Sequence, residues 1–299
     1  RCTDCRSAYL DPRPTEASIG RAYGTYYTHL FDPDSQASFE GLGVVRKARR
    51  MITNGYLNAR FGTTRQPQSV PGGSLVKLFP RHQRLLDAEF RFLPRPRPGQ
   101  RLLDVGCGNG AFLARAALAG WTVSGVDFDP KAVHAAQKAG LQVTLGSLTS
   151  LATAPETFDA ITMSHVIEHV HEPLKLLLEA RRLLKPGGVL FVETPNLDSL
   201  GLAIYGRHWR GIEAPRHLAL FNADSLSGAL SACGFRVETS HRRDNVTEGL
   251  FLQSKNLQAG RGALDGSVKL AWRDRLNVLL GSTWHAKSEF LSLTARRLG

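Results

Sequence analysis

The stretch that decides the fold is residues 102–113, which read Leu-Leu-Asp-Val-Gly-Cys-Gly-Asn-Gly-Ala-Phe-Leu. Apolar residues lead into Asp104, glycines then occupy alternate positions from Gly106 to Gly110, and an Ala- and Leu-rich run with helical spacing follows to Ala119. This order predicts a buried strand, a tight turn and a helix, as in a nucleotide-binding βαβ unit. Glycines suit such a turn because a ligand can approach the backbone more closely than a Cβ allows. The helix N-terminus then offers free N–H groups to an anion.

Two classes of cofactor fit this turn. The pattern G-x-G-x-x-A that starts at Gly106 also matches the fingerprint of dinucleotide-binding proteins, so the glycines alone do not choose. Asp104 favours S-adenosylmethionine, because a buried carboxylate needs a donor, and the ammonium of that cofactor supplies one while a pyrophosphate does not. A second strand, residues 122–126, ends at Asp127, which is placed to accept hydrogen bonds from both ribose hydroxyls of an adenosine.

Downstream segments extend the same pattern. Residues 157–163 are typical of a fourth strand, the segment Ser-His-Val-Ile-Glu-His-Val follows over 164–170, and residues 183–192 indicate a helix end, a turn and a fifth strand. In this order and spacing the segments resemble class I S-adenosylmethionine-dependent methyltransferases over roughly residues 98–240, with a closing strand near 289–295. The resemblance implies an α/β fold with a Rossmann-like seven-stranded sheet, six strands parallel and one antiparallel.

The resemblance also assigns cofactor contacts. Ser147 and Leu148 stand where the family often has an acid that binds the adenine amino group, and serine is a weaker acceptor. Ser164 and His165 follow the strand whose end lies beside the transferred methyl in that family. The predicted cofactor-binding residues are Asp104, Gly106, Cys107, Gly108, Gly110, Asp127, Phe128, Ser147, Leu148, Ser164 and His165.

An insert over residues 197–222 is the predicted substrate site, because it follows the fifth strand at the edge where open α/β sheets bind ligands. A surface loop carrying Trp209 among histidines, arginines and Glu213 favours a functional role. The alternative is a packed loop with Trp209 buried and its arginines in solvent. The predicted substrate contacts are Trp209, Arg210, Arg216 and Tyr27.

Candidates for a general base lie in the same region. The segment Pro-Arg-His-x-x-x-Phe over 215–221 resembles the substrate-side loop of methyltransferases of the ubiquinone-biosynthesis-like group, which supports His217. Glu213 and His169 are the second choices, and a purely structural role for Glu168 and His169 is an equal alternative. A base is needed only if the accepting group must lose a proton, as a hydroxyl or a carbon acid would.

Cysteine usage bears on metals and on compartment. The four cysteines do not form a disulfide framework, which fits a reducing cytoplasm. Cys2 and Cys5 form half of a four-cysteine zinc site, and their surroundings resemble the second half of a zinc module that precedes some sugar and natural-product methyltransferases. Because the first pair is missing from the sequence, we expect no bound metal.

The net charge of +12 invites a nucleic-acid interpretation. The basic residues are scattered, however, and no basic run interleaved with base-stacking aromatics is present. A small-molecule or lipid-linked acceptor is therefore the favoured partner, peripheral contact with a membrane is compatible with the charge, and nucleic acid is disfavoured. No run of about 20 apolar residues predicts a transmembrane segment. The oligomeric state stays open.

The expected organisation has two parts. Residues 1–97 hold the CxxC remnant and a helical lid (35–95), with helices over 38–60 and 81–92 separated by a linker over 62–73. Residues 98–299 form the cofactor-binding domain, including the insert. Later elements are a helix over 223–232, a strand over 235–241, accessory helices over 243–283 and a half-exposed strand over 288–295.

The predicted activity is transfer of a methyl group from S-adenosylmethionine to a small hydroxylated acceptor such as a sugar, nucleotide sugar, lipid-linked sugar or natural product. Oxygen is the first choice of methylated atom and carbon the second. Two alternatives remain: a nucleic-acid methyltransferase, which the charge favours, and a non-catalytic S-adenosylmethionine-binding module. The intact Asp104, glycine turn and Asp127 argue against the module.

Overall fold

The computed structural model describes residues 1–23, 41–243, 246–266 and 268–299. The chain forms two compact units. Residues 27–162 and 183–189 form the first, here called the turn unit, and residues 1–26, 163–182 and 190–299 form the second, the insert unit. Each unit combines segments from both sides of residue 97, so the boundary suggested there stays a prediction.

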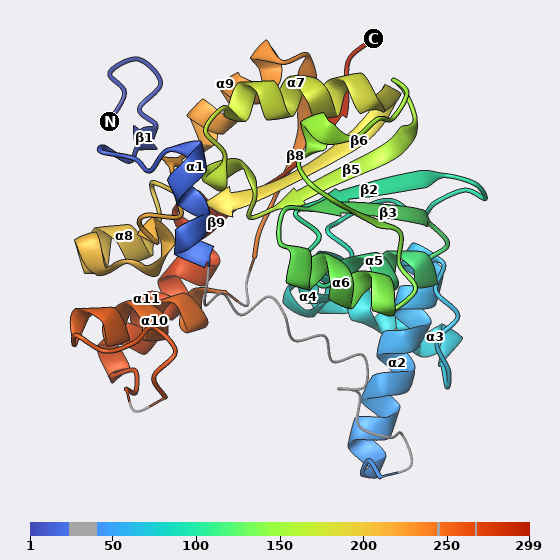
Figure 1. Cartoon of the computed structure of the whole chain (residues 1–299). Coiled ribbons are helices and arrows are strands. Elements are labelled where there is room, and N and C mark those ends of the chain that lie inside the picture. Colours follow the sequence, from blue (N-terminus) through green and yellow to red (C-terminus); the bar gives the residue numbers. More distant parts are fainter. Residues whose placement is uncertain (24–40, 244–245, 267) are drawn as a thin grey trace. The chain divides into compact units, whose positions relative to one another are not determined.

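Seven strands form one sheet in the order β4-β3-β2-β5-β6-β9-β8 (Figure 1). The strands are β2 Arg101–Val105, β3 Thr122–Asp127, β4 Val143–Leu145, β5 Phe158–Ser164, β6 Leu184–Pro195, β8 Phe235–His241 and β9 Phe290–Arg297. β2, β3 and β4 pair in parallel, and β9 runs antiparallel to β8. The predicted Rossmann-like seven-stranded sheet with one antiparallel strand is confirmed.

The closing antiparallel strand is confirmed as β9, but the expectation that it is half-exposed was wrong. β9 is an interior strand between β6 and β8, and Leu291, Leu293 and Ala295 are buried. Ser292, a polar residue of the alternation, is also fully buried, and its hydroxyl donates to Glu193 Oε2 over 2.6 Å. A polar residue with an internal partner can occupy the core, which an alternating pattern does not reveal.

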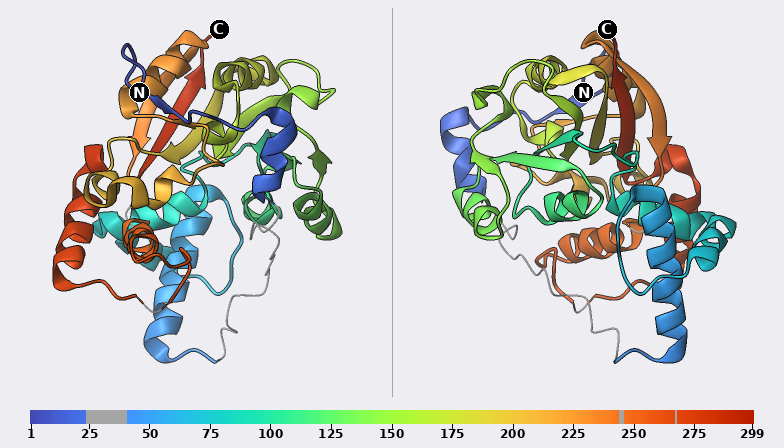
Figure 2. Two further views of the ribbon diagram at one scale, coloured as in Figure 1. Left: turned by 60° about the vertical axis from the view of Figure 1, so that its left-hand side comes forward. Right: turned by 90° about the vertical axis from the view of Figure 1, so that its right-hand side faces the viewer.

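Within the turn unit, helices α5 (Ala111–Leu118) and α6 (Pro130–Lys138) lie beside β2 and β3 (Figures 1 and 2). α6 begins where the sequence offers start signals. Asp129 caps it by accepting from Lys131 N over 2.9 Å, and Pro130 occupies the first helical position, where a missing N–H costs nothing.

The N-terminal part of the turn unit is helical, as predicted. It comprises α2 Val44–Phe61, α3 Val70–Leu75, the short 3₁₀ helix η2 Val76–Leu78, and α4 Pro80–Glu89. Tyr56 donates to Asp87 over 2.6 Å and the rings of Phe61 and Phe90 stack at 4.4 Å, which ties α2 to α4. The first helix was expected from residue 38, and residues 38–40 lie outside the described part of the chain.

Two boundaries in this region differ from expectation. The supposed linker over 62–73 contains the start of α3, whose first turn is capped by Ser69 accepting from Gly72 N. The glycines there serve close packing, because a Cβ on Gly73 would lie 2.6 Å from the backbone carbon of Gly55 in α2. α4 ends at Glu89, three residues before the expected end, and Arg91 and Phe92 adopt left-handed conformations.

The insert unit carries the remaining helices: α1 Glu16–Ile19, α7 Pro173–Leu183, α8 Leu200–Tyr205, α9 Ala223–Ala232, α10 Thr247–Gln258 and α11 Trp272–Thr283. The helix over 223–232, the strand over 235–241 and the accessory helices are confirmed. The insert was expected to be irregular but contains α8 and the strand β7 (Ala219–Leu220), which pairs antiparallel with β1 (Ala8–Tyr9). Among the described residues, no helix is both long and apolar enough to cross a bilayer.

Candidate functional site

The glycine turn of the turn unit has the predicted form. Gly106, Gly108 and Gly110 have φ values of 66°, 54° and 81°, a left-handed conformation that L residues rarely adopt. A Cβ on Gly110 would lie 2.3 Å from the side chain of Leu141, so packing requires that glycine. A Cβ on Gly108 would meet nothing within 4 Å. The backbone above Gly108 is therefore open to a ligand.

Asp127 at the end of β3 is fixed by the turn that it faces. Its Oδ2 accepts from Gly108 N over 2.7 Å and its Oδ1 accepts from Asp129 N over 2.9 Å. Burial raises the pKa of this carboxyl, and the backbone N–H groups oppose that shift. Each oxygen keeps a second lone pair, so both remain able to accept from a ribose hydroxyl.

Asp104 in β2 has a partner that the sequence did not reveal. Its side chain is fully buried, and Oδ1 accepts from the guanidinium of Arg91 and from Thr162 Oγ1. Arg91 also lies 3.8 Å over the ring of Phe112. Among the described residues, Asp104 Oδ2 has no hydrogen-bond partner. A buried carboxylate oxygen without a donor is costly, and an ammonium group of a ligand would satisfy it.

These observations fit S-adenosylmethionine. The open backbone at Gly108 suits its amino-acid and adenosine parts, Asp127 suits its ribose, and Asp104 Oδ2 suits its ammonium. Not every predicted contact involves a side chain. Cys107 and Leu148 are buried and have no side-chain group without a partner that would need a ligand, so we expect their backbone to meet the cofactor. Burial, followed by the nearby charge of Asp104, raises the pKa of the Cys107 thiol, which keeps it protonated.

Phe128 and Ser147 lie at the ends of neighbouring strands of this unit. Phe128, directly after β3, is 54% exposed. Gly146, after β4, has φ of 142°, and the Ser147 hydroxyl lies 2.9 Å from Thr149 Oγ1. Both side chains remain proposed contacts for the adenine ring.

Glu168 organises a second polar cluster, in the insert unit. It is fully buried, and its Oε1 lies 3.1 Å from His165 Nδ1 while its Oε2 accepts from Thr194 over 2.9 Å. Burial alone would raise the pKa of Glu168, but His165, followed by His169 and His217, lowers it to about 2. The carboxylate is therefore anionic at neutral pH.

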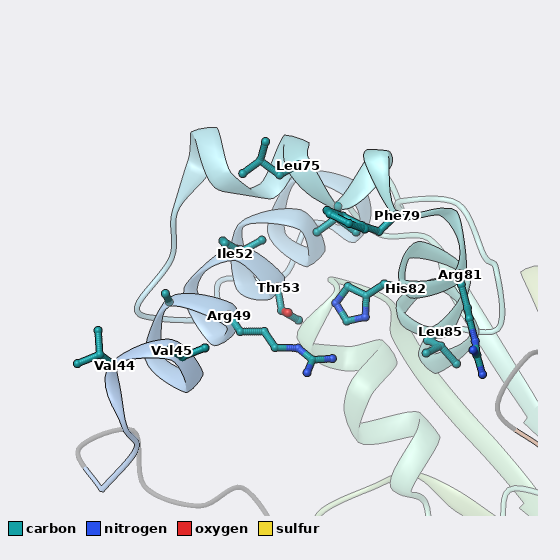
Figure 3. A pocket seen from close by; sticks show the side chains of 12 residues that line it. Val44, Val45, Arg49, Ile52, Thr53, Leu75, Phe79, Arg81, His82 and Leu85 are labelled. Carbon is teal, nitrogen blue, oxygen red and sulfur yellow. The ribbon is translucent and has the colours of Figure 1, made fainter.

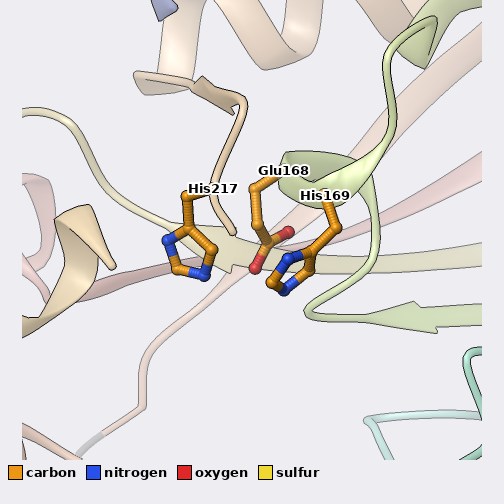
Figure 4. Close-up of side chains that lie close together, drawn as sticks. All are labelled: Glu168, His169 and His217. Carbon is orange, nitrogen blue, oxygen red and sulfur yellow. The ribbon is translucent and has the colours of Figure 1, made fainter. Parts of the chain in front are cut away.

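His169 and His217 flank this carboxylate, as Figure 4 shows. One nitrogen of each ring and one oxygen of Glu168 lie within 4.8 Å of one another, and the two rings meet edge to face at 4.6 Å. His217 Nδ1 lies 2.7 Å from the carbonyl of Gly211, which fixes Nδ1 as the donor and leaves Nε2 as the acceptor. Such a group is suited to hold either a proton or a divalent cation.

The protonation states of the two imidazoles follow from their surroundings. Burial lowers the pKa of His217 to about 4, although Glu168 opposes this shift. Burial lowers the pKa of His169 as well. Burial therefore favours the neutral form of His217 near pH 7, and its role as a base stays a prediction.

Glu213, a second candidate for the general base, is held in ion pairs. It adopts a left-handed backbone conformation, and its carboxylate lies between Arg210 Nη1 at 2.5 Å and Arg216 Nη2 at 2.6 Å. Burial would raise the pKa of Glu213, but these arginines and His217 lower it. Arg210 and Arg216 are paired with this acid, and their contact with a substrate stays a prediction.

Trp209 belongs to the core and not to a substrate surface. It is 1% exposed, packs with Tyr205 and Phe251, and donates from Nε1 to Glu289 Oε2 over 2.7 Å. The Glu289 Oε1 atom accepts from Gly201 N over 2.8 Å. Burial raises the pKa of Glu289 to about 7, against the effect of these two donors. The alternative of a packed loop was therefore right for Trp209.

Two tyrosines near the N-terminus bear on the predicted sites. Tyr27, a predicted substrate contact, lies outside the described residues. Tyr23, which the sequence did not single out, places its hydroxyl 2.9 Å from His169 Nδ1. This contact joins the N-terminal segment to the cluster of Glu168, His169 and His217.

Ser164 and His165 adjoin a network around Glu193 in β6. Ser164 donates to Glu193 Oε1 over 3.2 Å, and Arg243 donates to Oε2 over 2.7 Å. Burial would lower the pKa of His165, but Glu168 and then Glu193 raise it. Neither Glu193 nor Arg243 follows from a sequence motif, because they are 50 residues apart.

The CxxC pair lies in the loop before β1. Cys2 is partly buried, Cys5 is exposed, and both are free thiols, as are the buried Cys107 and Cys233. Among the described residues, the group that could hold a metal is the one at Glu168, His169 and His217, and it does not include this pair.

Known proteins are similar to a large part of this chain. A family model described as a methyltransferase domain matches residues 79–240, more than half of the chain. Two curated relatives are named ubiquinone biosynthesis O-methyltransferase. The relative from Cereibacter sphaeroides is 39% identical over 124 residues, covering 39% of this chain and 50% of its own length. The relative from Brucella anthropi is 36% identical over 157 residues, covering 48% and 63%. The chain thus spans less than two thirds of either relative.

Solved structures share the fold. An S-adenosylmethionine-dependent methyltransferase from Mesorhizobium loti matches with a TM-score of 0.51 at 20% identity, covering 72% of this chain and 98% of that chain. The cyclase SpnF matches with a TM-score of 0.51 at 24% identity, covering 73% and 81%. A cyclase on this fold shows that fold alone does not decide the reaction, which must be argued from the site.

Proposed function

Because the chain belongs to the methyltransferase-domain family, we propose that it transfers a methyl group from S-adenosylmethionine to the hydroxyl oxygen of a small acceptor. The observation that carries the proposal is the open glycine turn at Gly108, with the unpartnered Asp104 Oδ2 and the fixed Asp127 around it. S-Adenosylmethionine supplies a methyl group on a positively charged sulfur, which is already reactive. The chain's own residues then mainly bind and align.

The names of the curated relatives support oxygen as the methylated atom. Sugars, nucleotide sugars, lipid-linked sugars and natural products all remain candidate acceptors. The internal pairing of Arg210 and Arg216 with Glu213 weakens the case for a phosphate anchor in the insert. We therefore favour an acceptor that presents a neutral hydroxylated group to this unit.

O-methylation releases a proton from the acceptor hydroxyl, and we assign its removal to the cluster of Glu168, His169 and His217. A buried imidazole whose pKa is about 4 is a weak base by itself. The anionic Glu168 stabilises an imidazolium on either side of it, because the charges lie in a buried, low-dielectric setting. Proton removal is thus a property of the cluster and not of His217 alone.

The test replaces His217 by Gln and measures methyl transfer and cofactor affinity separately. General base catalysis is worth typically about 10²–10⁴ in rate, so kcat should fall in that range while S-adenosylmethionine binds as before. His134→Gln, on the exposed side of α6, is the matched control and should keep full activity. Full turnover by the His217 variant would show that proton removal does not need His217, and would leave His169 beside Glu168 or no base at all.

A chelation experiment distinguishes two roles for Glu168, His169 and His217, namely proton acceptor and metal ligand. If they accept a proton, excess EDTA leaves the rate of the parent enzyme unchanged. Loss of activity on chelation, restored by Mg²⁺ or Mn²⁺, would instead make Glu168, His169 and His217 metal ligands, and the expectation of no metal would be wrong.

A tritiated-methyl screen over phenols, sugars, nucleotide sugars, lipid-linked sugars and tRNA identifies the acceptor class. We expect label in one of the hydroxylated small molecules or lipid-linked sugars. Label in tRNA alone, with affinity that falls steeply as salt rises, would favour the nucleic-acid alternative.

A further inference from the structure

The N-terminal helices of the turn unit enclose a groove unrelated to the glycine turn. It has a volume of about 800 Å³ and lies between α2, the α3–η2 segment and α4. Its walls are mostly apolar, and they include Ile52, Leu75 and Phe79. Figure 3 shows Arg49 from α2 and His82 from α4 pointing toward one another in the middle of the groove, with Val44 and Val45 at one end and Arg81 and Leu85 at the other.

Several large apolar side chains around this groove are exposed to solvent. Val44 and Val45 are 83% and 82% exposed, and Leu78 and Phe79 are 71% and 63% exposed. Val44 and Val45 at the start of α2 and Phe79 directly after η2 line the groove, and Leu78 is the exposed neighbour of Phe79 in the chain. A contiguous apolar surface of this kind marks an interaction site.

The charge of the same region is mainly positive. Residues 41–89 contain nine lysines and arginines, against Asp87 and Glu89 in the last turn of α4. Arg46, Arg49, Lys77 and Arg81 are exposed, and they lie on the same helical segments as the apolar side chains. An acidic surface of a soluble protein would complement the positive charge of this face. It would rarely also offer an apolar environment for the exposed Val, Leu and Phe side chains. Basic side chains around exposed apolar ones are the arrangement that binds the interface of an anionic bilayer.

We propose that this basic and apolar face, formed by α2, α3–η2 and α4, docks the protein on the surface of an anionic phospholipid bilayer. The lysines and arginines meet the lipid headgroups, and Val44, Val45, Leu78 and Phe79 enter the boundary between headgroups and acyl chains. The contact is peripheral and reversible. It is independent of the proposed methyl transfer, since none of these residues belongs to the glycine turn or to the histidine cluster.

The test is flotation of the full chain with vesicles of phosphatidylcholine alone or of an equal mixture with phosphatidylglycerol. The chain should float with the anionic vesicles only, and binding should weaken as salt rises, because exposed charges are screened. Equal binding to both vesicles, or none to the anionic ones, overturns the proposal. Binding to heparin without binding to vesicles also overturns it, because the face would then serve a soluble polyanion.

Two variants assign the binding to this face. Replacing Arg46, Arg49, Lys77 and Arg81 by Gln should weaken partitioning about 100-fold or more, since each basic side chain near an anionic surface contributes about five-fold. Val45→Ser with Phe79→Ser should weaken it about ten-fold. All six positions are exposed, so the thermal midpoint should stay unchanged.

Two matched controls complete the design. Lys131→Gln with Lys138→Gln removes exposed charge from α6, and Trp272→Ser with Trp284→Ser removes exposed apolar surface from the insert unit. Both control variants should float like the parent chain. If either loses binding while the groove variants keep it, the docking face lies elsewhere and the proposal fails.

Discussion

Asp104 and Arg91 form a buried pair whose two members lie 13 residues apart in the sequence. Arg91→Met would leave a buried carboxylate with Thr162 as its remaining donor among the described residues. Losing one member of a buried ion pair costs about 3–5 kcal/mol, and that loss should appear as a lower free energy of unfolding in urea. Arg97→Met, at an exposed position, is the control and should change little. Equal stability of the two variants would show that Asp104 does not depend on Arg91.

Glu289 gives the insert unit a dependence on pH. Burial raises its pKa from 4.5 to about 7, so the folded chain holds this proton more tightly than the unfolded chain. The stability that follows is fully present below about pH 4.5 and is lost as the pH rises through about 7, for a total of about 3 kcal/mol.

Thermal unfolding across this range, in the parent chain and in Glu289→Gln, isolates the effect. The parent should lose more stability than the variant between pH 5 and pH 8, because only the parent ionises a buried carboxyl there. Parallel curves for the two proteins would mean that Glu289 titrates at its ordinary pKa.

At single residues the sequence predicted the cofactor turn well and the insert poorly. The glycine pattern, Asp104 and Asp127 depend on local spacing, and local spacing is visible in a sequence. Trp209 and Arg210 appeared functional because they stand in a loop, yet Trp209 is buried and donates to Glu289, and Arg210 is paired with Glu213. Residue type alone does not show whether a polar group meets a ligand or its own chain.

Among the elements, the contact of α2 with α3 depends on two small residues. A Cβ on Gly55 would lie 2.1 Å from the Ser69 carbonyl oxygen, and a Cβ on Gly73 would lie 2.6 Å from Gly55. Gly55→Ala should therefore lower the free energy of unfolding by about 1–3 kcal/mol, because the backbone of one helix must shift. Gly43→Ala, where a Cβ meets nothing within 4 Å, should not. A Gly55 variant as stable as the Gly43 variant would contradict this packing.

This contact explains why α3 was missing from the predicted elements. Gly72 and Gly73 are typical of a linker by composition, and their use for close packing requires knowledge of the opposing helix. β9 illustrates the same limit, because its alternation of polar and apolar residues indicates one solvent face. The polar Ser292 is buried through a hydrogen bond to Glu193, 99 residues away.

For the whole molecule, the order of motifs was the most reliable signal. The strand, glycine turn, helix and second strand are followed by later segments in the order and spacing of the resembling family. That resemblance predicted the seven-stranded sheet, which the structure contains. The net charge of +12 was harder to interpret, because the sum does not show where charges gather. Residues 41–89 carry nine of the basic residues and two acids, and only the structure shows that exposed Val, Leu and Phe lie on the same segments.

Calorimetric titration with S-adenosylhomocysteine tests the central claim most directly, using Gly108→Ala and a matched control. Gly108 and Gly99 have φ of +54° and +80°, and a Cβ on either meets nothing within 4 Å, so both substitutions carry similar backbone strain. Only Gly108 stands where the ligand is proposed to lie. We predict one binding site per parent chain, unchanged affinity for Gly99→Ala, and at least about ten-fold weaker binding for Gly108→Ala. Equal affinity of the two variants, or no binding by the parent chain, would contradict the account.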